Sequence, residues 1–445
     1  MKKFLIASIL LLTSAFFGFS QSDDLSDKKS ETHVLTVEDA VSLALENNIS
    51  IKQSKMDLDL LETKNKYSWN SVSPSISVSG GVNGSQSGKL ENFSDSQSNL
   101  SWSASGSLSL SLSPSIATSV KSAQLAYEQG QMTYEETKRK IELSVRKTFY
   151  QLLYFNEDLE LQQKSLDSAA ETYKSNLSKY NQGRLSELNL LTSQYNYESK
   201  IPTIENLKTT YESNLDSFKE VLGIKLSDKI ELNGNLEEAL KEVLPSDDEV
   251  EKNPSLENVP AIKSALKNIE IAENSLAATK FSAWGPSLSL SANASTGSGI
   301  NPSSDQTLSL SYSATVRIPL DGYLPWSSGS LSVQSQKESL EKLKQNLEQT
   351  KTSTMISVRS SINTIDQALT QLELYEKNVD LMQKTYDMTK TSYNVGSSDL
   401  LTLQNAEVNL YQAKYNVQNQ RYTIISAILD LENTLGIDFG TLNNN

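Results

Sequence analysis

The stretch LSWSASGSLSLSLSPS, residues Leu100–Ser115, decides how this chain folds. Serine occupies almost every second position of the stretch, and none of its residues is charged. Alternate side chains of a β-strand point to opposite faces, so most of the serines share one face. The other face is apolar and holds Trp102, Ala104, Leu108, Leu110 and Leu112. A two-faced run of about ten or more residues has the length of a tilted membrane-spanning strand.

Three further runs show the same alternation. The first places Val72, Ile76, Val78 and Val82 opposite Ser73, Ser75, Ser77 and Ser79. The other two carry Leu288, Leu290 and Ala292, then Leu308, Leu310, Tyr312, Ala314, Val316 and Ile318. We predict two β-hairpins whose serines line a wet lumen and whose apolar face meets lipid. The alternatives, a Ser-rich stalk or a soluble half-buried hairpin, are less consistent with the length and lack of charge of these runs.

Aromatic residues gather where the predicted strands meet helices, as in the interfacial girdle of membrane proteins. The residues are Trp69, Phe281, Trp284, Tyr323 and Trp326.

The chain contains an internal repeat. Tyr180-Asn181-x-Gly183 aligns with Tyr393-Asn394-x-Gly396 at a spacing of 213 residues. The same spacing places Leu222-Gly223-Ile224 on Leu435-Gly436-Ile437 without a gap. Each half therefore has the order helix, two Ser-rich strands, long helix, Gly turn, returning helix.

The long helices carry a heptad pattern, which is typical of left-handed supercoiling against neighbouring helices. An uninterrupted helix from about Ala117 to Asn181 would extend roughly 100 Å. The first seam is predicted to comprise Val145, Phe149, Leu152, Asn156, Leu159, Gln163, Leu166, Ala170, Tyr173, Leu177 and Tyr180, and the second holds the residues 213 positions later. Each helix is expected to end at its Gly and to reverse direction, with Ser186 or Asp399 as the cap of the returning helix. Pro202 should kink the first returning helix.

The first residues have the pattern of an export signal. Met1-Lys2-Lys3 is basic, Phe4–Phe19 is apolar, and Gly18 and Ser20 fit a cleavage site. The net charge of −14 argues against a nucleic-acid partner, and the absence of cysteine excludes thiol chemistry. His33 is the sole histidine, so we expect no metal site. The sequence has no convincing catalytic constellation and no Gly-rich phosphate loop, so we expect no cofactor and no enzyme activity. The sequence Ser144-Val-Arg-Lys147 matches Ser-x-x-Lys, but it lies in the middle of a predicted helix.

Four strands cannot close a barrel, and an open edge in lipid leaves backbone groups without hydrogen bonds. Two copies would give eight strands with a filled interior, whereas three copies give twelve strands with room for a lumen. A serine lining favours three copies, although symmetry alone does not exclude four.

The predicted organisation follows from these elements. The boundaries are 1–20 signal peptide, 21–68 N-terminal segment and first helix, 69–114 first hairpin, 115–224 first long helix, turn and return, 225–259 mid-length linker, 260–283 helix of the second repeat, 284–320 second hairpin, 321–437 second long helix, turn and return, and 438–445 tail.

The chain resembles the TolC family of outer-membrane efflux and secretion ducts. The resemblance covers nearly all of the mature chain and includes LTVEDAVSLALENN at Leu35–Asn48, the Tyr-Asn-x-Gly turns and the Leu-Gly-Ile ends. It implies a mainly α fold with a small β part. It also implies a homotrimer with a twelve-stranded outer-membrane β-barrel continued by a periplasmic α-helical barrel. A periplasmic adaptor (membrane fusion protein) and an inner-membrane ABC or proton-driven transporter would be the partners.

The function that this resemblance implies is a passive exit duct for small molecules or polypeptides. The alternative is a structural or adhesive coiled coil that reaches from periplasm to surface.

The resemblance also points to a gate at the two turns. The gating tyrosine of the family matches Tyr393, but its arginine is replaced by Ser398. The aspartates of the family's cation-binding ring fall on Thr402 and Asn405, and the Thr-Asp pair of the first repeat falls on Leu188 and Asn189. Asp399 is the carboxylate that remains, and it either forms a ring in the trimer or only caps a helix. The predicted gate and tip residues are Tyr180, Gly183, Leu188, Asn189, Tyr393, Gly396, Asp399, Thr402 and Asn405.

Overall fold

The computed structural model describes residues 32–87, 97–244, 258–299 and 307–443. The predicted signal peptide and residues 245–257 of the predicted linker lie outside the described residues. The elements in chain order are β1 (Thr32–Leu35), α1 (Val37–Asn47), α2 (Ile49–Lys66), η1 (Ser68–Val72), β2 (Ser75–Ser87), β3 (Gln97–Leu112), α3 (Ser115–Asn181), α4 (Glu187–Leu222), β4 (Lys229–Leu232), α5 (Leu236–Val243), α6 (Pro260–Trp284), β5 (Ser287–Gly299), β6 (Thr307–Arg317), η4 (Asp321–Tyr323), α7 (Ser328–Asn394), α8 (Leu400–Leu435) and η5 (Thr441–Asn443).

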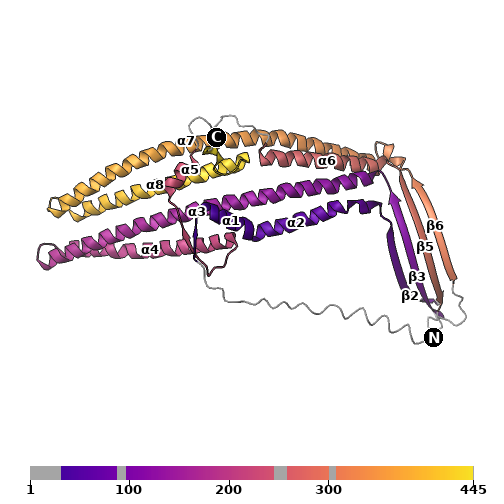
Figure 1. The fold of residues 1–445 in the computed structure, drawn as a ribbon, viewed down its shortest axis with the longest axis horizontal. Helices are drawn as coiled ribbons and strands as arrows, with labels where there is room; N and C mark the ends of the chain where they lie inside the picture. The colour runs from indigo at the N-terminus through magenta and orange to yellow at the C-terminus, as the bar shows by residue number, and fades with distance from the viewer. Residues whose placement is uncertain (1–31, 88–96, 245–257, 300–306, 444–445) are drawn as a thin grey trace.

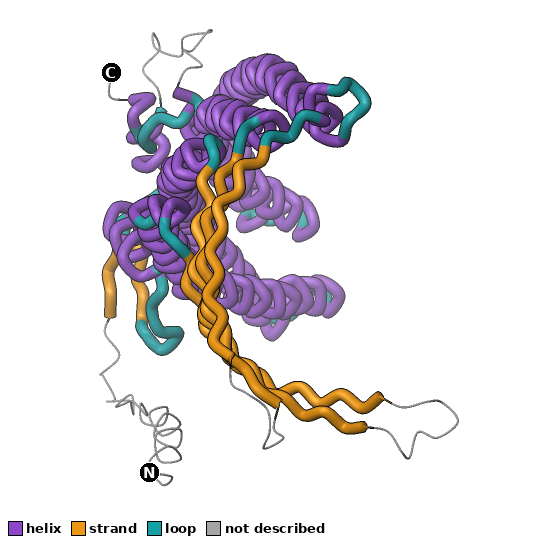
Figure 2. The backbone as a smooth tube through the Cα atoms, turned by 90° about the vertical axis from the view of Figure 1, so that its right-hand side faces the viewer, coloured by secondary structure: helices purple, strands orange, loops and turns teal. Residues whose placement is uncertain are grey.

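The predicted mainly helical, duplicated fold is confirmed. The four long strands lie at one end of the molecule, and the turns that join α3 to α4 and α7 to α8 lie at the other end (Figure 1). Between them, α3 and α7 each run for 67 residues, which corresponds to about 100 Å at 1.5 Å per residue. The sheet is strongly curved along its strands, as Figure 2 shows.

The strands form one antiparallel sheet in the order β2-β3-β5-β6. Its register confirms the two predicted faces, because Ser109 pairs with Ser75 on one side and Ser291 on the other. The Oγ atoms of Ser75 and Ser109 lie 2.6 Å apart, and Ser77 and Ser107 repeat that contact at 2.6 Å. Hydroxyls therefore form a polar ladder along one face.

One detail of the strand prediction is wrong. Val72 lies in the short helix η1, and the first strand begins only at Ser75. The alternation of residues 72–82 continues across this boundary, so periodicity alone could not place the start of the strand.

The helices form a layer of four at each level. In the half nearer the sheet, α2 contacts α3, α3 contacts α6, and α6 contacts α7. In the half nearer the turns, α4 contacts α3, α3 contacts α8, and α8 contacts α7. Elements of the first repeat lie at one side of each layer, and α7 lies at the other.

The predicted seam of α3 is right from Val145 to Leu152 but wrong from Asn156 onward, toward the turn. There the buried residues are Asp158, Leu161, Ser165, Ala169 and Asn176. Both α4 and α8 pack on α3, so its buried face lies between two neighbours. Most residues of that face are small or polar. A prediction based on large apolar residues therefore identifies a neighbouring stripe of the same helix instead.

A compact core lies midway along the helices. Its largest fully buried side chains include Phe149, Leu152, Phe218, Leu236 and Ile428. The strand β1 pairs in parallel with β4, from Thr32 opposite Lys229 to Leu35 opposite Leu232. This pairing was not predicted, because both strands are four residues long and they lie far apart in sequence.

Local sequence explains several of the helix ends. Thr36 and Asp39 form a reciprocal capping box at the start of α1. Gly223 ends α4 in the left-handed conformation with φ at +70°, and a Cβ there would lie 2.6 Å from the carbonyl oxygen of Asn47. The helix α4 continues through Pro202.

Candidate functional site

The two turns opposite the sheet have the same construction. Gly183 and Gly396 adopt positive φ values of +68° and +82°, which a glycine adopts without strain. The N–H of Arg184 donates to the carbonyl of Lys179 at 2.8 Å, and Ser397 donates to Ser392 at 2.9 Å. Each long helix therefore ends in a Schellman-type cap, and the chain is free to return antiparallel.

The returning helices begin with the two predicted caps. Ser186 accepts a hydrogen bond from the N–H of Asn189 at 3.4 Å. Asp399 accepts from the N–H of Thr402 at 2.7 Å. This contact holds the pKa of the exposed Asp399 carboxyl below its usual value. The capping function of Asp399 is therefore confirmed, whereas its membership of a ring stays a prediction.

Tyr393 links the two repeats near the turns. Its hydroxyl donates to Oδ1 of Asn176 at 2.7 Å, so a residue of α7 is tied to a buried residue of α3. The ammonium of Lys179 lies 4.8 Å from the centre of the Tyr393 ring, in a cation–π arrangement. Burial raises the pKa of the Tyr393 phenol above its ordinary value. The equivalent residue of the first repeat, Tyr180, is exposed.

Most of the other predicted tip residues are exposed in the single chain. Leu188 is 73% exposed, Thr402 and Asn405 are exposed, and Asn189 is half-buried.

Among the predicted gate residues, the structure joins Asp399 to Thr402 within one turn. It joins Tyr393 to Asn176, which the sequence analysis did not predict. The assignment of all of these residues to a gate remains a prediction.

Sequence reasoning missed a layer of buried polar groups about two to three turns further into the helices than the Tyr393–Asn176 contact. Glu407 of α8 is only 4% exposed, and its Oε1 has no hydrogen-bond partner among the described residues. Lys200 of α4 donates to Ser165 of α3 at 2.7 Å, and Tyr386 of α7 lies 3.2 Å from the hydroxyl of Ser168. All four helices thus contribute to one layer. The sequence signal that could have indicated this layer is the presence of polar residues at heptad positions that face neighbouring helices.

The charges around Glu407 determine its titration. Burial raises the pKa of its carboxyl, while Lys200, Ser168 and Lys390 act in the opposite direction. Glu407 in turn contributes to the raised pKa of Tyr411, which is about 12, mainly through burial of that phenol. The carboxyl is therefore harder to ionise than an exposed glutamate.

The aromatic residues predicted for the membrane interface do lie where the strands meet the helices. The indole N–H of Trp284 donates to the carbonyl of Gly322 at 2.8 Å, and its ring stacks on Tyr323 with centroids 6.3 Å apart. Trp69 and Trp326 are exposed. Their contact with a membrane interface is still a prediction.

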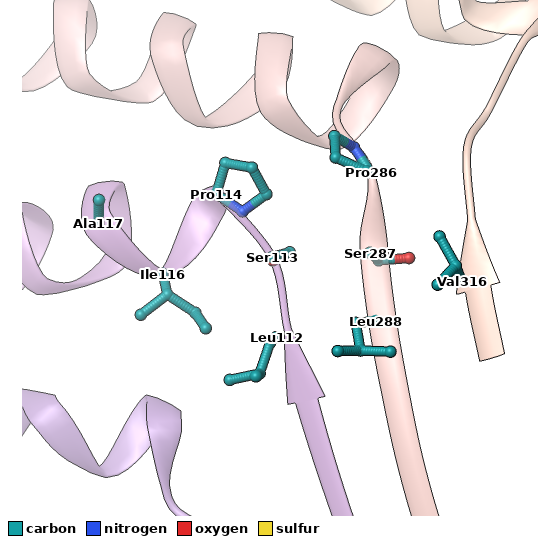
Figure 3. Close-up of a pocket in the computed structure, with 9 residues that line it drawn as sticks. All are labelled: Leu112, Ser113, Pro114, Ile116, Ala117, Pro286, Ser287, Leu288 and Val316. Atoms are coloured by element: carbon teal, nitrogen blue, oxygen red, sulfur yellow. The ribbon is translucent and has the colours of Figure 1, made fainter. Parts of the chain in front are cut away.

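A shallow groove of about 590 Å³ lies at the same junction. Leu112, Leu288 and Val316 line it from three neighbouring strands, and Pro114 and Pro286 mark the ends of two of them (Figure 3). All three strand residues belong to the apolar face of the sheet. The apolar face therefore continues to the edge of the helical part.

Over the described residues, no helix has the length and apolar character needed to cross a membrane. No group of acidic or histidine side chains in these residues is arranged to hold a metal ion.

Comparison with known proteins gives one family. The family model described as outer membrane efflux protein matches residues 40–223 and 253–437. The two matched ranges correspond to the two repeats. No curated protein sequence matches the chain significantly.

Solved outer-membrane channels share the fold. The CmeC channel of Campylobacter jejuni superposes with a TM-score of 0.70 at 17% identity, covering 90% of this chain and 85% of that one. The open state of the Neisseria gonorrhoeae MtrE channel gives 0.67 at 17% identity, covering 92% and 90%. VceC of Vibrio cholerae gives 0.63 at 13% identity, covering 91% and 96%.

Proposed function

The chain belongs to the outer membrane efflux protein family, and we propose that it forms the passive exit duct of a tripartite efflux or type I secretion system. As a member of this family it is a channel protein of the outer membrane that extends into the periplasm, and it is not an enzyme. A periplasmic adaptor and an inner-membrane ABC or proton-driven transporter are its proposed partners. The duct carries small molecules or polypeptides that the transporter selects.

The main support for the proposal is that the sheet and each layer of helices have two outer elements without a neighbour on one side. At each level of the molecule, four elements lie side by side and leave two outer elements. Elements of the first repeat (β2, α2, α4) form one edge, and elements of the second repeat (β6, α7) form the other. Contact of the first edge of one copy with the second edge of the next is a head-to-tail arrangement, and such an arrangement forms a ring when the rotation between copies closes.

A ring of three copies would enclose an open lumen. Twelve strands leave a lumen, whereas eight fill their interior with side chains. The ladder of serine hydroxyls between Ser75 and Ser109 and their neighbours supplies a polar lining for such a lumen. The open state of MtrE, to which the fold is similar, supports a duct that opens and closes.

Planar lipid bilayers test the duct. The purified trimer is expected to insert and to conduct ions in discrete steps. The control is the buffer of the same detergent without protein. A trimer of the right mass that inserts but never conducts, at any voltage or salt concentration, would contradict the duct and favour a structural or adhesive coiled coil.

A further inference from the structure

Arg317 is the only charged residue in β2, β3, β5 and β6 as the structure describes these strands. It is the last residue of β6, at the end of the sheet that meets the helices (Figure 1). Its side chain is exposed. A single charge on an otherwise neutral sheet determines the sign of the electric field around it.

The register of the sheet places Arg317 on the serine face. Arg317 pairs with Ser287. Ser291 and Ser313 form a pair further along the same face, with their Oγ atoms 2.8 Å apart. The adjacent Val316 belongs to the other face, where it lines the apolar groove (Figure 3). The guanidinium of Arg317 therefore extends from the wall that we assign to the lumen, and not toward lipid.

A hollow of about 580 Å³ lies beside Arg317, between the end of β6 and the helices α6 and α7. The helical side of this hollow is made of small and neutral polar residues, which include Thr279, Ser282 and Ser332. Asp321 is the other charged residue of the lining. In the described part of the chain, Arg317 forms no ion pair with Asp321 or with another carboxylate. The N–H donors of its guanidinium are therefore available to a solute.

We propose that Arg317 of three copies forms an anion-binding ring where the helices meet the barrel, and that its ligands are solutes with a carboxylate or phosphate group. The proposal rests on the proposed duct and names a class of ligand for it. A guanidinium presents a planar fork of N–H donors, which fits the two oxygens of a carboxylate or phosphate. Anionic cargo would therefore be favoured over cationic cargo at this level.

A ring of this size acts on every solute that passes. Twelve strands about 4.7 Å apart and tilted by about 40° enclose a barrel with a backbone radius of roughly 12 Å. An arginine that extends inward brings its charge to within about one Debye length of the axis, which is about 8 Å at physiological salt. The three charges therefore attract anions and repel cations across the whole opening.

Planar bilayers test the ring with inorganic pyrophosphate as the probe, added on the extracellular side. We expect pyrophosphate to block the wild-type trimer. Arg317→Gln should raise the half-blocking concentration roughly 10-fold, because a hydrogen bond between two charged groups is lost. Arg317→Lys keeps the charge without the planar fork and should have an intermediate effect. Asp321→Asn is the matched control, since it removes the negative charge from the same hollow and should lower the half-blocking concentration.

Single cysteines test which face Arg317 occupies, since the chain has no native cysteine. Arg317→Cys should react in the membrane with charged methanethiosulfonate reagents, which do not enter lipid. The cationic trimethylammonium reagent should restore the pyrophosphate block, whereas the anionic sulfonate reagent should not. Ala314→Cys, which pairs with Leu290 on the apolar face, is the control and should react with neither reagent.

The outcomes separate the anion-binding ring from the duct. A channel that conducts but that pyrophosphate does not block, or blocks equally in Arg317→Gln, overturns the ring and leaves the duct standing. Reaction at Ala314→Cys without reaction at Arg317→Cys would show that Arg317 faces lipid headgroups, and would also overturn the ring. A trimer that never conducts contradicts the duct itself.

Discussion

The hydroxyl of Tyr393 on α7 donates to Oδ1 of Asn176 on α3, 2.7 Å away, and so joins the two hairpins at the end opposite the sheet. Asn176 is fully buried, and its Nδ2 has no partner among the described residues. Loss of the tyrosine would leave the whole buried amide without a hydrogen bond, which costs about 1–3 kcal/mol.

Tyr393→Ala is therefore expected to loosen the turn end and to raise resting conductance in planar bilayers. Tyr393→Phe also leaves Asn176 without its partner, but it keeps the ring and its contact with Lys179, so it should produce a smaller rise. The matched control is Tyr180→Ala at the equivalent exposed position of the first repeat. A leak as large in Tyr180→Ala as in Tyr393→Ala would show that the Asn176 contact has no special part in closure.

Asp399→Ala is expected to raise resting conductance less than Tyr393→Ala does. The carboxylate accepts the N–H of Thr402, and the loss of such a cap costs about 1 kcal/mol of helix stability without opening a packed contact. If three copies also bring Asp399 into a ring, a trivalent cation will block the wild-type channel and will block Asp399→Ala less.

Asp399→Asn is the control for that measurement, because asparagine caps a helix without a charge. A wild-type channel that ignores the trivalent cation reduces Asp399 to a helix cap. Equal block in the wild type and Asp399→Asn would assign the cation to other carboxylates.

Neighbouring residues of β3 should respond differently to the same substitution. Leu110 pairs with Leu290 on the apolar face, whereas Ser109 pairs with Ser291 on the serine face. Leu110→Arg places a charge toward lipid at a cost of about 2–4 kcal/mol per chain near the midplane, and should reduce the membrane-assembled trimer. Ser109→Arg faces the lumen and should leave assembly intact. The yields are compared on gels of outer-membrane fractions, and equal losses would mean that the faces are assigned the wrong way.

The sequence predicted the repeat and the strand faces because both depend on simple periods. Serine occupies every second position of β3 from Ser101 to Ser111, and a spacing of 213 residues relates Gly183 to Gly396. The caps at Ser186 and Asp399 also followed from local rules, since each lies directly before a helix. Local patterns therefore sufficed for the elements and for their ends.

Contacts between distant elements could not be predicted in the same way. The position of Asn176 on α3 depends on both α4 and α8, and its hydrogen bond with Tyr393 spans 217 residues. The pairing of β1 with β4 likewise joins segments that lie far apart in the sequence. Glu407 was missed for a related reason, because a lone glutamate in an amphipathic helix is normally on the exposed side.

The buried carboxyl of Glu407 should make the stability of the folded state depend on pH. Its pKa is raised in the folded chain by burial, so the folded state holds the proton more tightly than the unfolded state does. An acid of this kind favours the folded state at low pH, and that contribution is lost as the pH rises above the ordinary glutamate value. Glu407→Gln keeps a neutral side chain at every pH. The variant should therefore unfold at a higher denaturant concentration than the wild type at pH 8, and the difference should shrink toward pH 4.

The measurement is the denaturant midpoint of helix unfolding by circular dichroism between pH 4 and pH 8. Other carboxyls also titrate in this range: burial raises the pKa of Asp158 and of Glu432, whereas hydrogen bonds lower the pKa of Asp39 and of Asp399. The wild type and the variant share this background, so only their difference reports on Glu407.

The charged groups around Glu407 are Lys200 and Lys390. If these two lysines outweigh burial, Glu407→Gln will be the less stable protein at pH 8, and the sign of the prediction is wrong. Glu212→Gln, at an exposed position of α4, is the control and should leave the difference near zero at every pH.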